Sequence, residues 1–590
     1  MKTDFEFEEN QSGVSGMCFW IFAAVALFLF LGENPLWGPE VAWAESSREM
    51  LVSGDFLHPS VNWQVTFERT PFFCWFMAFF IRLFGNSEWA VRIPAALAAM
   101  GGLYGTFSLA QRLFDRKTAV LSFWFLLSCY GFLFWGRLGT ADAANMAAFV
   151  LAVNGLFSAE EKVSWKKYCL FYLAAFACVL LKGFSSLVIL LTFLLPHLLI
   201  RKRWLSHLKK RNFAALCLGF FLGAGLFYLA LIRPPADVVA SSDYDMIQSI
   251  WEHIKRECFW NHGKNNAVPF YSYVLYFLTL LLPWAPLFLV CAFVILREKR
   301  EEDIRIRELL LGTAAVLLLL TVFTPYRQNQ TLPLLPFAAI FMAAVIYREG
   351  EEKGITYLVT FLRWCGIFVG ALALALPVML PVFKMMFHQS PPLLAVIAVP
   401  VAGLVILTVS VLDDEPGNCV EHWTGIPVRM ASMTLAMVVI VATFFGVVGP
   451  ALSVYRTEKK FIQSLTPVLA GIPPKHIAFY QNRSMEPFLY YLQWNTPVVL
   501  LEKPEQMRLF LNRSAGEKAA FICRSGYQKR LFRDLAAAGI SAADLKIAGK
   551  EPGKGEKWLV FLVDVPKNTV VRSLKFSPEI QQNKSGSPQP

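Results

Sequence analysis

The sequence consists mainly of apolar runs of about 20 residues, each bounded by a short charged break. A helix of that length crosses the ~30 Å hydrocarbon layer of a bilayer. Hydrophobic residues make up 56% of the chain and charged residues only 17%, a balance that excludes an ordinary water-soluble enzyme. We therefore expect a polytopic membrane protein.

The apolar runs predict an all-α bundle of about 13 transmembrane helices. No small-residue cleavage site follows the first run, so we expect it to be a retained helix and not a signal peptide. The expected helices cover residues 17–32, 91–113, 118–136, 143–159, 168–181, 184–200, 212–232, 271–296, 309–324, 332–347, 355–383, 392–412 and 430–449.

Lysine and arginine residues concentrate in every second loop, for example at 112–117, 201–211 and 297–307. Basic loops stay in the cytoplasm, so this pattern places the N-terminus in the cytoplasm. An odd number of crossings then puts the C-terminus outside. The net charge of +12 therefore orients the chain in the membrane and does not indicate a nucleic-acid partner.

Three longer segments fall on the outer side in this topology: 33–90, 233–270 and everything after Pro450. The last segment has more charged residues, and short apolar strand-like runs alternate in it with helix-like stretches. This pattern predicts a small α/β domain over 451–576, which follows a membrane domain over 1–450. Its strands are expected at 476–480, 497–501, 519–523 and 558–563, and its helices at 486–493 and 529–538. The polar tail 577–590 is expected to be disordered.

The first outer segment, 33–90, carries the strongest functional signal. Trp43–Leu51 and Phe72–Phe84 are apolar or amphipathic enough to lie in the membrane interface. Polar residues of this loop would then be held at the level of the lipid headgroups.

Several motifs together resemble the GT-C glycosyltransferases that use polyprenyl-phosphate sugars. They are GPE-x-x-WAE-x-SREML at 38–51, ER-x-PFF at 68–73, RLGTAD at 137–142 and LKG at 181–183. The most similar branch is the lipid A aminoarabinose transferase group, whose relatives are the protein O-mannosyltransferases. The resemblance implies an undecaprenyl-phosphate sugar donor, inverting transfer and a C-terminal outer α/β domain.

The resemblance implies catalytic roles for three acids. The Asp-Glu pair of the family corresponds to Pro39 and Glu40 here, so an acid–base or charge-orienting role falls to Glu40. Glu45 matches the acid of a Tyr-Ala-Glu element, and Asp142 matches the acid at the outer end of the third and fourth helices. On the residues alone, Glu40 could simply occupy the first turn of a helix, and Asp142 could cap one.

Four cations are candidates for binding the donor phosphate. Arg69 stands where the family has a lysine, and a guanidinium suits phosphate as a bidentate donor. Lys182 matches the family's Lys-Gly-Pro turn, and Arg137 and Arg327 lie at expected outer helix ends. Arg69 and Lys182 could also be interfacial anchors that reach toward lipid headgroups.

The resemblance also suggests one metal site. In relatives a Glu and a His at comparable positions hold a metal ion, which makes Glu68 and His262 a candidate pair for a divalent cation. A single histidine in a polar loop is otherwise usually just solvated. The only cofactor expected is thus this divalent metal ion.

The implied reaction has a clear electrostatic requirement. Nucleotide sugars are absent outside the inner membrane, so the donor must be lipid-linked, and its departing group is a phosphate whose growing charge needs cations. The acceptor is expected to be a lipid A-like lipid, another envelope glycan or a protein at the bacterial inner membrane, with membrane lipids as further partners. A transporter or lipid flippase is the alternative, as is a non-catalytic lipid-binding relative suggested by Pro39.

Overall fold

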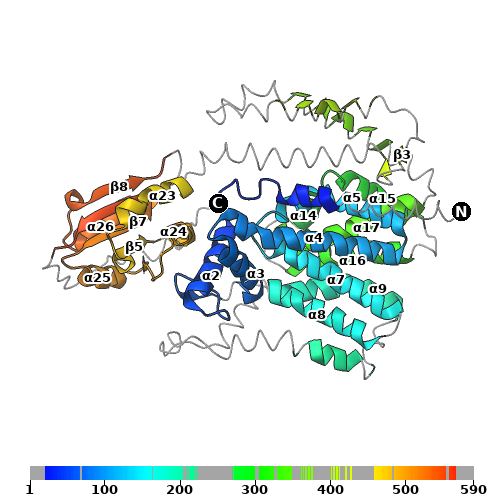
Figure 1. Cartoon of the computed structure of the whole chain (residues 1–590), viewed down its shortest axis with the longest axis horizontal. Coiled ribbons are helices and arrows are strands. Elements are labelled where there is room, and N and C mark those ends of the chain that lie inside the picture. Colours follow the sequence, from blue (N-terminus) through cyan, green and yellow to red (C-terminus); the bar gives the residue numbers. More distant parts are fainter. Residues whose placement is uncertain are drawn as a thin grey trace. The chain divides into compact units, whose positions relative to one another are not determined.

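The computed structural model describes residues 20–66, 69–161, 164–202, 212–219, 271–298, 304–323, 328–348, 458–481, 484–552 and 557–566, with scattered positions between them. The chain divides into two compact units. One comprises Met1–Pro59 and Thr66–Ala451, and the other comprises Ser60–Val65 and Leu452–Pro590 (Figure 1). A short piece of the first outer loop therefore belongs to the same unit as the C-terminal region.

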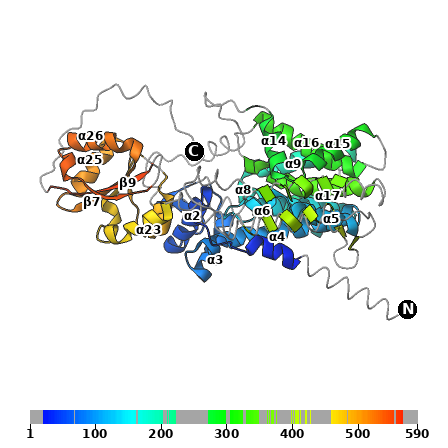
Figure 2. The same cartoon turned by 90° about the horizontal axis from the view of Figure 1, so that it is seen from above.

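The first unit is helical, and its described elements follow the apolar runs. Helix α7 packs against both α4 and α8, and α17 packs against α5 (Figures 1 and 2). The helices are α2 (Pro39–Ser53), α3 (Pro71–Phe84), α4 (Glu88–Leu113), α5 (Arg116–Leu127), α6 (Tyr130–Trp135), α7 (Asp142–Glu161), α8 (Trp165–Lys182), α9 (Phe184–Ile200), α14 (Ser272–Leu280), α15 (Ala285–Arg297), α16 (Ile304–Phe323) and α17 (Leu335–Arg348), with a 3-10 helix, η2, at Gln328–Leu334.

Within the described residues, three helices are long and apolar enough to cross a bilayer, at Glu88–Leu113, Asp142–Glu161 and Asn329–Arg348. The bent pair α14–α15 would make a fourth. The expected helices at 430–449 and most of 212–232, 355–383 and 392–412 lie outside the described residues. The total of 13 spans therefore stays a prediction.

Two expected single helices are each broken in the structure. The expected helix 118–136 is α5 followed by the short α6, and the expected helix 271–296 is α14 followed by α15, bent by 114° around Pro283. The two breaks bond to each other: the Tyr130 amide donates to the Leu282 carbonyl at 2.8 Å, and the Trp284 indole donates to Ser128 Oγ at 2.8 Å. A backbone amide that has no helical partner at one break thus donates to a free carbonyl at the other. A helix inside an apolar bundle can be interrupted only where its unpaired backbone groups find such partners.

The second unit contains a five-stranded sheet with the strand order β6-β5-β7-β9-β8. Strands β6, β5 and β7 are parallel to one another, and β9 runs antiparallel to both of its neighbours, β7 and β8. The strands are β5 (Ile477–Tyr480), β6 (Val499–Leu501), β7 (Lys518–Arg524), β8 (Lys546–Lys550) and β9 (Trp558–Asp564). The four strands expected from the sequence are confirmed, whereas β8 escaped prediction because four of its five residues are lysine, glycine or alanine.

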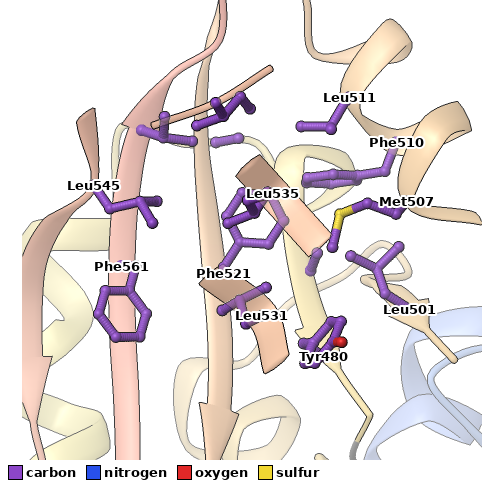
Figure 3. Packing of buried hydrophobic residues seen from close by; sticks show 14 of the residues in the cluster. Tyr480, Leu501, Met507, Phe510, Leu511, Phe521, Leu531, Leu535, Leu545 and Phe561 are labelled. Atoms are coloured by element: carbon purple, nitrogen blue, oxygen red, sulfur yellow. The ribbon is translucent and has the colours of Figure 1, made fainter. Parts of the chain in front are cut away.

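Helices cover both faces of this sheet (Figure 2). Alternating residues of β7 point to opposite sides: Phe521 joins one apolar cluster and Ile522 the other. The first cluster includes residues of α25 (Pro504–Arg513) and α26 (Gln528–Ala537), and Figure 3 shows Met507, Phe510, Leu531 and Leu535 packed with Phe521 and Phe561. The second cluster includes residues of α23 (Glu458–Leu469) and α24 (Glu486–Leu492).

Two further short strand pairs are described. A hairpin in the first outer loop pairs β1 (Ser60–Val61) with β2 (Gln64–Val65), and β3 (Cys419–Val420) pairs with β4 (Ile426–Pro427). The expected disordered tail 577–590 lies outside the described residues.

Candidate functional site

Helix α2 brings the polar residues of the first outer loop into the protein interior. Every residue from Glu40 to Met50 is buried, and α2 packs against α3. The expected helix at 43–51 is present, but the prediction that it is amphipathic is wrong, because its polar residues are as buried as its apolar ones. Two carboxylates of α2, those of Glu40 and Glu45, are paired with arginines, which is how charged groups are accommodated inside proteins.

Glu40 forms a buried ion pair with Arg92 of α4. Arg92 Nε donates to Glu40 Oε1 at 2.9 Å, and Arg92 Nη2 donates to Glu40 Oε2 at 2.9 Å. The backbone amides of Gly139 and Trp37 also donate to this carboxylate, at 2.7 and 2.9 Å. Arg92 in turn donates to the carbonyls of Leu31, Asn34 and Pro35. Glu40 thus links the start of α2 to α4 and to the RLGTAD segment by hydrogen bonds. Pro39, the residue before it, lies in the first turn of α2, a position that prolines favour.

Glu45 pairs with Arg48 one turn further along α2. Arg48 Nε and Nη2 donate to the two carboxylate oxygens at 2.8 and 2.7 Å, and both side chains are almost completely buried. Burial raises the pKa of Glu45 from about 4.5 to about 8, against the opposing effect of the Arg48 guanidinium. The Glu45 carboxyl is therefore a weaker acid than an exposed glutamate.

Asp142 and Lys182 meet across helices α7 and α8. Lys182 Nζ lies 2.7 Å from Asp142 Oδ1, and Thr140 Oγ1 donates to Asp142 Oδ2 at 2.8 Å. Lys182 is the last residue of α8, because Gly183 follows with φ 78° and ends the helix, a backbone conformation that favours glycine. The side chain of Asp142 is 4% exposed and that of Lys182 is 27% exposed, so the ammonium is the part of the pair open to a ligand.

Thr70, the residue after Arg69, contacts the last turn of α8. Thr70 Oγ1, which is buried, donates to the carbonyl of Leu181 at 3.2 Å. This contact joins the ER-x-PFF motif to the LKG motif, 111 residues apart in the chain. It places Arg69 and Lys182 each one residue from the same hydrogen bond, and Arg69 is half-buried. The structure thus pairs Lys182 with Asp142 and brings the backbone next to Arg69 to the end of α8, whereas a shared phosphate site of Arg69 and Lys182 stays a prediction.

Arg137 points elsewhere. Its guanidinium is buried and donates to the backbone carbonyl of Ala26 at 2.7 Å and to that of Leu29. These carbonyls belong to the last turn of the helix at 20–28 and the residue after it, where cations are favoured by the helix dipole. The contacts give Arg137 a role in holding the first helix.

Three predicted site residues lie outside the described residues: Glu68, His262 and Arg327. Among the residues that are described, no group of three His, Cys, Asp or Glu side chains could hold a metal ion. The candidate metal site is therefore still a prediction.

Two polar contacts of the loop 33–90 were not predicted from the sequence. Arg92, the partner of Glu40, is a single arginine inside an apolar run, a pattern that does signal a buried partner. The second contact joins the buried His58 to the more exposed Asp55 just before the β1–β2 hairpin, with Asp55 Oδ2 2.7 Å from His58 Nδ1. In the sequence, this contact is indicated only by the spacing of three residues between Asp55 and His58.

Comparisons with known proteins agree with the motifs. Residues 68–227 match the family model described as dolichyl-phosphate-mannose-protein mannosyltransferase. An uncharacterized protein of Aquifex aeolicus is 28% identical over 60% of this chain and 68% of its own length. The undecaprenyl phosphate-alpha-4-amino-4-deoxy-L-arabinose arabinosyl transferase of Shewanella sediminis is 27% identical over 45% of this chain. The match spans 47% of that curated relative, about half its length.

A solved structure is similar along nearly the whole chain. The crystal structure of ArnT from Cupriavidus metallidurans bound to undecaprenyl phosphate superimposes with a TM-score of 0.68, covering 92% of this chain and 97% of ArnT at 18% identity. At that identity the likeness establishes the fold. The chain thus has the fold of a GT-C glycosyltransferase, and in sequence it resembles the lipid A aminoarabinose transferase group.

Proposed function

We propose that this protein transfers one sugar, with inversion, from undecaprenyl phosphate or a similar polyprenyl phosphate to an acceptor outside the inner membrane of a bacterium. The observation that carries the proposal is the Lys182–Asp142 pair, which joins the RLGTAD and LKG motifs; the hydrogen bond from Thr70 to Leu181 supports it by bringing the ER-x-PFF motif to the end of the same helix. The arabinosyl transferase names of the relatives support the same donor class.

The proposed chemistry follows from the charges at this point. When the acceptor attacks the anomeric carbon, the bond from that carbon to the phosphate oxygen breaks, and the lipid phosphate leaves with an additional negative charge. Arg69 and Lys182 stabilise that charge as it develops. Part of the Lys182 charge is directed toward Asp142 before the donor binds, so the phosphate competes with this carboxylate for the ammonium.

The roles of the acids differ in this proposal. Glu40 has four hydrogen-bond donors on its carboxylate, so we assign it to holding the loop. Asp142 is the remaining base for an acceptor hydroxyl, whereas an acceptor phosphate needs only to be positioned. A lipid A-like acceptor, another envelope glycan and a protein all fit this chemistry.

We also propose an inner-membrane location with the N-terminus in the cytoplasm and the C-terminal α/β domain outside. The basic loops and the apolar helices support this topology. A divalent metal held by Glu68 and His262 remains part of the proposal.

The test is release of the lipid phosphate from a radiolabelled polyprenyl-phosphate sugar by the purified protein in detergent. Arg69→Ala and Lys182→Met should each lower release at least tenfold. Arg82→Ala is the matched control, since Arg82 is an exposed arginine near the end of α3 in the same outer loop. Equal release by all three variants would contradict the site, and an intact donor that crosses vesicle membranes would indicate a flippase instead.

A further inference from the structure

His197, in the last turn of α9, contacts one glutamate from each of two other helices. Its Nε2 lies 3.1 Å from Glu160 Oε2 at the end of α7, and its Nδ1 lies 3.0 Å from Glu308 Oε2 near the start of α16. None of the three side chains is more than 9% exposed. The ring of Phe157 packs on the imidazole, with the ring centroids 4.6 Å apart. The histidine is thus a buried bridge between three helices of the first unit.

The two contacts together require a second proton on the imidazole. A neutral imidazole has one N–H donor and one acceptor nitrogen, so one of its nitrogens would face a carboxylate oxygen with a lone pair. An imidazolium donates from both nitrogens. Glu308 also accepts from Arg201 Nε at 2.6 Å. The imidazolium, the guanidinium and the two carboxylates then form a group without net charge, which lowers the cost of burying these charges.

Glu160 depends on this proton more than Glu308 does. Its second oxygen, Oε1, is buried and has no hydrogen-bond partner among the described residues. Glu308 keeps Arg201 when the imidazole is neutral, so loss of the proton weakens the contact between α7 and α9 first. The other charged side chains at these helix ends have partners of their own: Glu161 pairs with Arg112, Lys167 with the Ser158 carbonyl and Arg305 with the Leu113 carbonyl.

We propose that the His197 imidazolium is a pH-dependent bridge that holds the end of α9 to the end of α7. The bridge is intact where the imidazole carries both protons, and it opens as the pH rises and one proton is lost. In the proposed topology these helix ends face the cytoplasm, because the basic segments 201–211 and 297–307 adjoin them. The inference does not rest on the proposed transferase function, since Asp142 lies at the opposite end of α7.

The test is amide hydrogen exchange of the full-length protein in detergent from about pH 6 to about pH 9, a range that spans the ordinary titration of histidine. Protection is expressed relative to the intrinsic exchange rate at each pH. In the wild type, protection of the peptides that cover the ends of α7 and α9 should fall as the pH rises. His197→Gln keeps one donor and one acceptor, as in a neutral imidazole. Its protection at these ends should be about tenfold lower than that of the wild type at the lowest pH, and equal to it at the highest.

A second variant removes the need for the proton while keeping the bridge. In Glu160→Gln the side-chain amide can donate to the Nε2 of a neutral imidazole, so protection at the upper end of the pH range should exceed that of the wild type. His476→Gln is the matched control, because His476 is a buried histidine whose Nδ1 contacts the Ser514 hydroxyl and not a carboxylate. This control should keep the wild-type pH profile at α7 and α9.

Two results would overturn the inference. One is protection at these helix ends that changes with pH in parallel in the wild type and in His197→Gln. The other is an equal loss of protection at both ends of α7 in His197→Gln at every pH, which would indicate general destabilisation and not a local bridge.

Discussion

Lys182 Nζ and Asp142 Oδ1 lie 2.7 Å apart where α7 begins and α8 ends, and the lysine is the more exposed partner. A buried carboxylate that loses a paired cation is destabilised, so the pair is favourable without a ligand. In the proposed function a lipid phosphate would compete with Asp142 for the ammonium of Lys182. The pair would then link donor binding to the state of Asp142.

Asp142→Asn separates the two roles of this pair. The asparagine no longer competes with phosphate for Lys182, so donor affinity should be kept or increased. If Asp142 accepts the proton of an acceptor hydroxyl, kcat should fall at least about 100-fold, the usual contribution of a general base. Steady-state kinetics with varied donor concentration measure both the donor KM and kcat. An unchanged kcat would leave Asp142 as only the partner of Lys182.

Glu40→Gln should affect stability more than catalysis. The substitution leaves the Arg92 guanidinium buried without its counter-charge, and breaking such a pair costs about 3–5 kcal/mol. We expect the melting temperature in detergent to fall by several degrees while the folded fraction keeps its kcat. Glu33→Gln is the control, since Glu33 is exposed in the same loop. A large drop in kcat at an unchanged melting temperature would restore a chemical role for Glu40.

The buried Glu45 should make the stability of the first outer loop depend on pH. Its pKa is about 8 in the folded protein and about 4.5 when exposed, so the folded state keeps a proton that the unfolded state loses. Stability should therefore fall as the pH rises from about 5 to 8. Glu45→Gln removes this titration, so its melting temperature should decline less over the same range. Parallel pH profiles for the two proteins would argue against a raised pKa.

Removal of divalent metal tests the pair Glu68 and His262. If these side chains hold a metal ion, dialysis against EDTA should lower lipid-phosphate release, and added metal should restore it. His262→Ala should show the same loss without restoration. Metal analysis of the purified protein provides an independent readout. Full activity in EDTA, together with an unaffected His262→Ala variant, would remove the metal from the proposal.

Much of the helical architecture follows from the sequence, because hydrophobic periodicity and length are local properties. The ends of α8 and α9 were predicted within a few residues, since Gly183 interrupts an otherwise continuous apolar run. Four strands of the α/β unit were predicted because short apolar runs between polar residues are also a local property of the sequence. The breaks at Ser128 and Pro283 were not, because each depends on hydrogen bonds that the other supplies.

The motifs of the sequence by themselves predicted, through their resemblance to a known family, that Arg69, Lys182 and Asp142 share one site, and the structure pairs two of them, Lys182 and Asp142. Only the tertiary structure decided how the charges are distributed among partners. It pairs Glu40 with Arg92, directs Arg137 to the first helix, and brings Asn62 to Val498. The physical reason is that a charge or an amide acquires its role from the groups that desolvate and contact it, and here those groups lie up to 436 residues away along the chain.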